Sequence, residues 1–339
     1  MSSNRSNRQW RLAARPVGNI RGSDFELVEA PIPEPADGEF VVAVTHISLD
    51  PAMRGWMNAG RSYIPPVEIG EVMRALTLGV VISSRNTGFA EGDLVHGTFG
   101  AQEYAVSDGA GVYTITPVAG QSPALYLGVL GMTGMTAYFG LLDVGGVQSG
   151  NTVLVSGAAG AVGTTVGQIA RIKGARVVGV AGGSEKCGKL VDELGFDAAV
   201  DYKAGHLLDQ LRRNTPDFVD VFFDNVGGDI LNQGLTRLAR GARVVICGAV
   251  SQYNNVETVT GPSNYISLLV SRASMTGFVV FDYVDRYPEA VAEMSRWLTE
   301  GRLHSVEDTV RGDIDTFPDT LARLFSGENT GKLVLELAR

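Results

Sequence analysis

The sequence predicts a two-domain α/β protein, with a β-rich, barrel-like domain followed by a doubly wound parallel sheet. Its 339 residues exceed the length of one ordinary domain. Up to about Pro123, short β-type runs alternate with turns rich in Gly and Pro, whereas beyond Gly128 strands alternate with helical stretches. We therefore expect one domain from residues 1–127 plus 311–339, and a second from residues 128–310.

Composition limits the classes of protein. With 45% hydrophobic and 19% charged residues the chain can bury substantial cores, and a net charge of −9 argues weakly against nucleic acid as a partner. No apolar run approaches the ~20 residues that a membrane-spanning helix needs. Met1–Trp10 is polar and carries arginines, unlike a signal peptide, and Cys187 and Cys247 are too few for a disulfide framework. These features predict a soluble, cytoplasmic protein without a membrane partner.

In the first domain, the β-type runs are Glu39–Ile47, Leu76–Ser83 and Gln102–Val106. In the second, we expect strands at Thr152–Ser156, Arg176–Val180, Asp197–Tyr202, Phe218–Asp224, Ala242–Cys247 and Ser274–Val280. The expected helices are Val162–Lys173, Glu185–Leu194, Leu207–Arg213, Ile230–Ala239 and Pro288–Glu300. The tail holds a helix, Thr316–Phe325, and a strand, Lys332–Leu337, that needs a partner from the first domain.

A glycine-rich segment, residues 156–163 (SGAAGAVG), follows a buried strand and opens a helix. This context favours a dinucleotide site over an ordinary glycine-rich turn. Gly160 would let the backbone approach a pyrophosphate, whose charge the amides at the helix start would bind. Gly163 would let the helix lie close to the sheet.

The second strand indicates which dinucleotide is bound. An NAD site usually places Asp or Glu at the end of this strand to hold the ribose 2′-hydroxyl. Here the strand ends in Ala181-Gly182-Gly183-Ser184, with no acid. Lys186 can instead pair with a 2′-phosphate, and Tyr202 can add a hydrogen bond. A solvated lysine at a helix start is the alternative for Lys186, but the missing acid favours NADPH.

Two common catalytic sets are absent from the sequence. None of the ten tyrosines is followed four residues later by Lys, and the first domain has no cysteine. The four histidines (His46, His96, His206 and His304) are scattered, so we expect no catalytic zinc. Hydride transfer helped by hydrogen bonds remains, and it suits the reduction of an activated carbon–carbon double bond through an enolate.

The chain resembles the zinc-free prostaglandin reductase and leukotriene 12-hydroxydehydrogenase branch of the medium-chain dehydrogenase/reductase superfamily, which includes bacterial curcumin reductase. The resemblance runs nearly end to end. It is carried by Ser48–Met57 (SLDPAMRGWM), Leu130–Leu142 (LGMTGMTAYFGLL), Gly157–Gly167, Asp224–Gly228 (DNVGG) and Cys247–Asn254 (CGAVSQYN). It implies a GroES-like β-barrel-type catalytic domain, a Rossmann NADP-binding domain, reduction of enones with NADPH, and a homodimer.

The resemblance also implies site residues. Those for the cofactor are Gly160, Ala161, Val162, Gly163, Lys186, Tyr202, Asn225, Cys247, Gly248, Ala249, Ser251, Tyr253, Phe278, Val279, Val280 and Asn329. Tyr253 would stand beside the substrate carbonyl as the catalytic residue that stabilises the enolate. The alternative is that Tyr253 is a structural loop tyrosine and that a cofactor hydroxyl stabilises the enolate. Tyr63 and Met132 would line the substrate pocket, although Tyr63 is equally well explained as a loop anchor.

Two positions depart from the family pattern. Ala52 replaces the tyrosine of SLDPYMR, and Thr133 replaces the proline of GMPG. Both lie where the family has its substrate pocket, so substrate preference does not transfer. Two other functions remain open: a quinone reductase with the same cofactor and fold, and a catalytically silent NADPH-binding protein.

Overall fold

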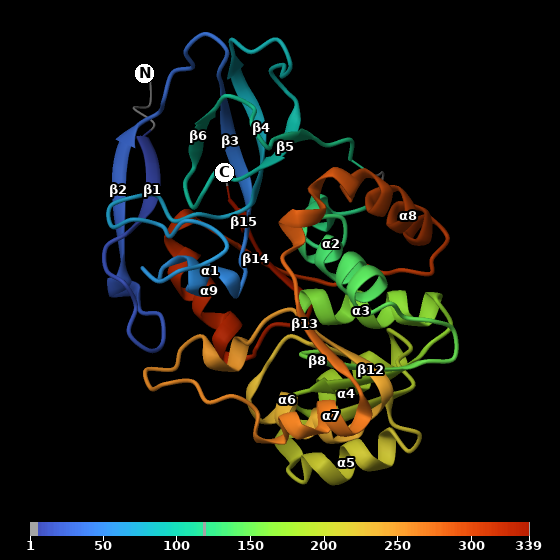
Figure 1. The fold of residues 1–339 in the computed structure, drawn as a ribbon. Coiled ribbons are helices and arrows are strands. Elements are labelled where there is room, and N and C mark those ends of the chain that lie inside the picture. Colours follow the sequence, from blue (N-terminus) through green and yellow to red (C-terminus); the bar gives the residue numbers. More distant parts are fainter. Residues whose placement is uncertain (1–5, 118–119, 339) are drawn as a thin grey trace. The chain divides into compact units, whose positions relative to one another are not determined.

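The computed structural model describes residues 6–117 and 120–338. Its contacts divide the chain into two compact units, coloured along the sequence in Figure 1. Unit 1 contains the described residues up to Leu127 together with those from Glu307 onward, and unit 2 is Gly128–Val306.

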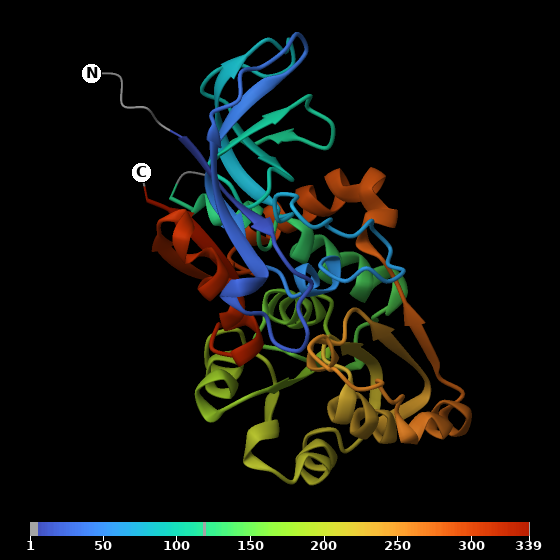
Figure 2. The same ribbon diagram turned by 90° about the vertical axis from the view of Figure 1, so that its left-hand side faces the viewer.

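Unit 1 is built on β-strands. In chain order they are β1 (Ser6–Leu12), β2 (Phe25–Pro31), β3 (Phe40–Ser48), β4 (Thr77–Ser84), β5 (Leu94–Gly97), β6 (Tyr104–Ser107), β7 (Tyr113–Thr114), β14 (Glu307–Gly312) and β15 (Lys332–Leu337). β1 and β2 form an antiparallel pair, blue in Figure 2. The others form a sheet in the order β14-β15-β3-β4-β5-β7, with β6 also paired to β3. The described residues of this unit also form the α-helices α1 (Ala52–Trp56) and α9 (Phe317–Ser326).

The tail strand finds the partner that its sequence requires. β15 pairs antiparallel with β3 through Val334↔Ser48, and parallel with β14 along its whole length. This return to the first unit confirms the expectation for Lys332–Leu337. Because β14 begins at Glu307, the expected domain boundary at residue 311 falls inside a strand.

The ring of His96, on β5, has a buried nitrogen atom that makes no hydrogen bond. Its Nε2 is the one buried side-chain nitrogen or oxygen, within residues 6–117 and 120–338, that has no hydrogen-bond partner. Its neighbours across the sheet are Leu78 and Tyr113, and its ring stacks near that of Tyr113. Burial lowers the pKa of His96 to about 4.

We expect this histidine to make unit 1 acid-sensitive. The folded form takes up the proton near pH 4, whereas the unfolded chain takes it up near pH 6.5. The free energy of unfolding therefore does not depend on this group above pH 6.5. As the pH falls from 6.5 toward 4, the free energy of unfolding decreases by at most about 3 kcal/mol, because the unfolded chain binds the proton first. Chemical denaturation of His96→Phe and the parent across this range checks it. If the free energy of unfolding depends on pH in the same way in His96→Phe and in the parent, the expectation is contradicted.

Unit 2 contains a six-stranded parallel sheet in its described residues, in the order β10-β9-β8-β11-β12-β13. The strands are β8 (Thr152–Ser156), β9 (Arg176–Ala181), β10 (Ala198–Asp201), β11 (Val219–Asp224), β12 (Leu238–Ile246) and β13 (Ser274–Gly277). The chain starts in the middle of the sheet, builds outward to β10, then crosses back to β11. This order confirms the doubly wound Rossmann sheet that the sequence predicts.

Helices cover both faces of this sheet. They are α2 (Met132–Phe139), α3 (Ala161–Ile172), α4 (Ser184–Asp192), α5 (Leu207–Asn214), α6 (Gly228–Gly234), α7 (Ile266–Ser271) and α8 (Tyr287–Thr299). Figure 1 shows α3 on one side of the sheet and α5, α6 and α7 on the other. Apolar side chains of α5 and α6, such as Leu211 and Leu231, pack against Phe222 in the core.

The structure corrects two sequence boundaries in unit 2. The helix expected at residues 230–239 ends at Gly234, and a 3-10 turn leads into β12 at Leu238, because Leu238 is buried in the core under the sheet. The strand expected at residues 274–280 ends at Gly277, and Val280 already begins a 3-10 helix. Phe278 and Val279 therefore lie in a loop beyond the strand.

Candidate functional site

The carboxyl ends of the six parallel strands meet at one edge of unit 2. The segments that follow these ends are Gly157–Gly163, Gly182–Lys186, Tyr202, Asn225, Cys247–Tyr253 and Phe278–Val280. All the cofactor residues that were predicted in unit 2 therefore lie along this edge. β8 lies between β9 and β11, where the winding of the sheet reverses, and ligands of doubly wound sheets bind at this point.

The glycine loop, residues 157–163, joins β8 to α3, and its glycines leave space around the backbone at two positions. A Cβ on Gly163 would lie 2.3 Å from the Gly157 carbonyl oxygen and 2.7 Å from Ala158 Cα, so only glycine allows this close approach. A Cβ on Gly160 would meet only the Gly157 oxygen within 4 Å and otherwise enter open space. Gly160 is the N-cap of α3 and provides no side-chain cap. The helix start thus presents backbone amides suited to an anion, with Ala161 and Val162 in its first turn.

The end of β9 lacks an acid and is covered by side chains from the turn that follows β10. A Cβ on Gly182 would lie 2.9 Å from Tyr202 Cε1 and 3.0 Å from Lys203 Cε. The Tyr202 ring and the Lys203 stem therefore lie across Gly182. Lys186 is half-buried in the first turn of α4. The sequence does not predict this position of Lys203, because the strand pattern does not show toward which residue its side chain turns.

A buried carboxylate connects three strand ends. Asp224, at the end of β11, is fully buried and accepts hydrogen bonds from the Ser156 hydroxyl (2.5 Å) and from the amide of Gly227 (3.0 Å). Ser156, at the end of β8, accepts in turn from the amide of Asn225 (2.8 Å), and the Asn225 side chain donates to the Ser156 carbonyl (2.7 Å). The Asp224 carbonyl accepts from the Cys247 amide (2.9 Å). Burial raises the pKa of Asp224, and its hydrogen bonds oppose that shift.

The stretch after β12 is folded over the same edge. Ser251 donates its hydroxyl to the Val226 carbonyl (2.7 Å), which fixes the middle of the stretch to the end of β11. The Tyr253 hydroxyl accepts from the Ala249 amide (3.3 Å) and lies 2.9 Å from where a Cβ of Gly248 would be. Tyr253 therefore bends back over Gly248, where a side chain would have to displace its hydroxyl.

The segment after β13 places its phenylalanine ring in the core of unit 2. The Phe278 ring fills the space above Gly140, where a Cβ would lie 2.5 Å from it, and contacts Phe223 edge-on. Val280 is buried, and its carbonyl accepts from the Tyr287 hydroxyl. Phe278 is thus oriented into the core of unit 2, so a contact between this segment and a cofactor would come from the backbone.

Three predicted residues lie elsewhere. In unit 1, the Asn329 side chain donates to the Gly331 carbonyl, and the half-exposed Tyr63 accepts a hydrogen bond at its hydroxyl from Trp56 Nε1 (3.2 Å). In unit 2, Met132 is half-buried at the start of α2. Beside it, the Thr133 hydroxyl donates to the Gly128 carbonyl (3.0 Å), which explains how a threonine is accommodated there.

The segment that contains Ala52 is held by core packing and by a buried ion pair. Ala52 begins α1 and packs against the core of unit 1. The same segment contains a buried ion pair, in which Lys332 Nζ lies 2.5 Å from Asp50 Oδ1 and 2.9 Å from the Leu49 carbonyl. The Ser48 hydroxyl donates to the same carboxylate. The SLDP segment is therefore tied to the C-terminal strand.

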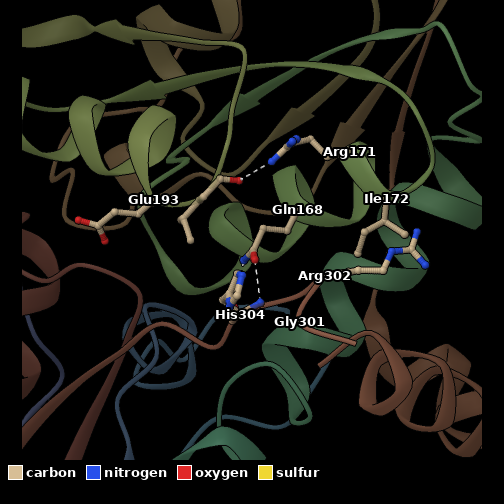
Figure 3. A pocket seen from close by; sticks show the side chains of 8 residues that line it. Gln168, Arg171, Ile172, Glu193, Gly301, Arg302 and His304 are labelled. Atoms are coloured by element: carbon tan, nitrogen blue, oxygen red, sulfur yellow. Dashed lines mark hydrogen bonds between the residues drawn. The ribbon is translucent and has the colours of Figure 1, made fainter. Parts of the chain in front are cut away.

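A separate hollow of about 330 Å³ lies in unit 2, as Figure 3 shows. Its lining residues are Gln168, Arg171, Ile172, Glu193, Leu194, Gly301, Arg302 and His304. It lies where α3, α4 and α8 end, so its cationic side chains face the partly negative ends of three helices. Arg171 donates to the Leu194 carbonyl and Gln168 holds the His304 backbone. These hydrogen bonds hold neighbouring segments of unit 2 together. The hollow lies at the end of α3 opposite the glycine loop.

Comparisons with known proteins agree with this geometry. A family model described as the N-terminal domain of oxidoreductase matches residues 8–115, and one described as zinc-binding dehydrogenase matches residues 161–296. The NADPH-dependent curcumin reductase of Escherichia coli is 40% identical, covering 98% of this chain and 97% of its own. Prostaglandin reductase 1 of Bos taurus is 36% identical, with 97% and 98% covered.

A solved structure extends the match. The crystal structure of CurA from Vibrio vulnificus in complex with NADPH aligns with a TM-score of 0.93 at 42% identity, covering 98% of this chain and 99% of that one. Across residues 6–117 and 120–338, no group of three or more His, Cys, Asp or Glu side chains is placed to hold a metal ion. Nor is any helix in those ranges long and apolar enough to cross a membrane. The chain belongs to the prostaglandin reductase branch of the medium-chain dehydrogenase/reductase superfamily.

Proposed function

We propose that the protein reduces the carbon–carbon double bond of α,β-unsaturated ketones with NADPH. The observation that carries the proposal is the edge of unit 2. There an uncapped helix start, Lys186 with Tyr202, and the stretch ending at Tyr253 follow the carboxyl ends of strands of one parallel sheet. Its relatives are reductases by name. NADPH oxidation that depends on an added enone tests it. Binding of NADPH without any turnover would indicate a silent binding protein instead.

The residues fit a phosphorylated dinucleotide. The open space above Gly160 leaves room for a pyrophosphate beside the amides of α3. Lys186 and Tyr202 would hold the 2′-phosphate, and Asn225 with the stretch Cys247–Tyr253 would hold the nicotinamide end. For unit 1 we keep Asn329 as a proposed cofactor residue and Tyr63 as a proposed substrate residue, and for unit 2 we keep Met132 as a proposed substrate residue.

The chemistry requires one stabilising hydrogen bond. When bound, the reduced nicotinamide supplies a hydride to the β-carbon of the substrate. Negative charge then develops on the substrate carbonyl oxygen, and we assign Tyr253 as the catalytic residue whose hydroxyl donates to it. The Ala249 amide donates a hydrogen bond to this hydroxyl. The α-carbon then takes a proton from solvent or from a tyrosine.

Lys186→Ala is expected to raise the Michaelis constant for NADPH much more than that for NADH, because the variant lacks a partner for the phosphate. Steady-state kinetics with both cofactors measures the difference. Lys189→Ala is the matched control, since Lys189 lies on the same helix and pairs with Glu185 (2.9 Å). An equal effect of Lys186→Ala on both cofactors would refute the assignment.

We also propose a reducing, cytoplasmic setting, which the two cysteines support. Cys187 and Cys247 are both free thiols and both half-buried. Burial raises the pKa of Cys247 to about 12 and that of Cys187 in the same direction. Both are therefore protonated at neutral pH and react slowly with oxidants.

We propose that two copies of the chain associate through the β13 edge of unit 2. β13 ends the sheet, and all four of its residues are exposed. Nearby, α7 exposes Ile266, Leu269 and Val270 by 54%, 72% and 65%. An open strand edge beside apolar side chains is suited to pairing with a second copy.

Light scattering after size exclusion is expected to give twice the mass of one chain. The double variant Leu269→Glu/Val270→Glu is expected to give the mass of one chain, because it places like charges on the apolar face. A parent protein that stays monomeric at tens of micromolar would contradict the dimer.

A further inference from the structure

Lys203 lies over the end of β9, next to the residues proposed to hold the 2′-phosphate. It follows β10 in the 3-10 turn Tyr202–Ala204. Its Cε and the Tyr202 ring both approach Gly182 to within about 3 Å of a Cβ position. The absence of a side chain at Gly182 lets both residues lie there. The stem of Lys203 therefore rests on the strand end rather than extending freely into solvent.

The acids near this position are already engaged. The Asp201 carboxylate accepts from the amides of Gly183 (2.8 Å) and Lys203 (2.9 Å). Glu185 pairs with Lys189. In the part of the chain that the structure describes, the Lys203 ammonium takes part in no ion pair. The strand end thus carries a cation whose charge is not neutralised within the fold.

A phosphate monoester has a charge of about −1.5 to −2 at neutral pH, which one lysine only partly balances. The start of α4, where the N-cap Gly183 provides no side-chain cap, contributes partial positive charge. We propose that Lys203 is a second cation for the 2′-phosphate and, with Lys186, sets the preference for NADPH over NADH. This inference rests on the proposed function, since it assumes that the 2′-phosphate binds at the end of β9.

Calorimetric titration of the full chain separates the phosphate contribution from turnover. The variants are Lys203→Gln and, as a matched control that removes the same charge, Lys189→Gln. The probes are NADPH against NADH, and adenosine 2′,5′-bisphosphate against AMP. We expect Lys203→Gln to weaken both phosphorylated probes by about fivefold, as for a partly exposed ion pair, and to leave NADH and AMP within about twofold. The Lys189→Gln control should leave the affinities for all these probes unchanged.

Gly182→Ala provides an independent test that leaves all charges in place. Its Cβ would displace the Tyr202 ring and the Lys203 stem, so it should also weaken the phosphorylated probes selectively. Selective weakening by both variants supports the inference. If Lys186→Ala reduces NADPH affinity while Lys203→Gln does not, Lys203 is only a solvated lysine and the inference is wrong. If the parent does not prefer NADPH at all, the proposed function itself fails.

Discussion

Replacing Tyr253 with phenylalanine is expected to lower the turnover of an enone by roughly ten- to a thousand-fold, while NADPH binding stays close to that of the parent. The phenyl ring can still cover Gly248, so the change removes little more than the hydroxyl. That hydroxyl accepts from the Ala249 amide, which orients it and strengthens it as a donor. Without it, the charge on the substrate oxygen loses a stabilising hydrogen bond.

Single-turnover kinetics with saturating NADPH measures this effect, and quenching of intrinsic fluorescence measures cofactor affinity. Tyr265→Phe is a suitable control, since Tyr265 is an exposed tyrosine of the same unit. Unchanged turnover in Tyr253→Phe would transfer the stabilising role to a cofactor hydroxyl or to water. A loss confined to NADPH affinity would make Tyr253 a binding residue only.

The second large effect is expected at Asp224. Asp224→Ala leaves the Ser156 hydroxyl and the Gly227 amide without their buried acceptor, at a cost of about 2–4 kcal/mol in unfolding free energy. It also removes the group that holds Asn225 and the glycine loop in register through Ser156. We therefore expect a lower affinity for NADPH and a lower turnover in addition to the loss of stability.

Asp220→Ala on the same strand is the matched variant. Its carboxylate accepts from the Thr152 amide (2.7 Å) and so joins β11 to β8 at the opposite edge of the sheet. Both variants should lower the midpoint of urea unfolding, but only Asp224→Ala should change the kinetic constants at temperatures where both are folded. Equal kinetic effects would show that Asp224 contributes to stability alone.

The parallel sheet of unit 2 could be predicted from the sequence because its central strands are buried on both faces and form continuous apolar runs. Thr152–Ser156 matches β8 at both ends. β1 and β14 were missed for the opposite reason. Their sequences, SNRQWRL and EDTVRG, are polar, and it is the partner strands that hold them in a sheet. α2 was missed because it is buried on nearly all sides and contains Gly134, where a Cβ would lie 1.7 Å from the Val129 oxygen.

The site could be predicted in part. The glycine loop and the end of β9 carry their chemistry in residue types and spacing, and these patterns are the basis on which Gly160, Gly163 and Lys186 are predicted as cofactor residues. Asp224 and Ser156 act through hydrogen bonds between strands 68 residues apart, which no local pattern encodes. Lys203 is a similar case, since its proposed role depends on the direction of a flexible side chain. The core position of the Phe278 ring likewise depends on Gly140, far away in the chain.

The most direct test is the mass of the product formed from an enone and NADPH. Incubation with a simple α,β-unsaturated ketone should give a product two mass units heavier that still reacts as a ketone, with NADPH much more effective than NADH. A quinone and a saturated ketone in parallel complete the assay. If the product is the unsaturated alcohol, or if only the quinone consumes NADPH, reduction of the carbon–carbon double bond is contradicted.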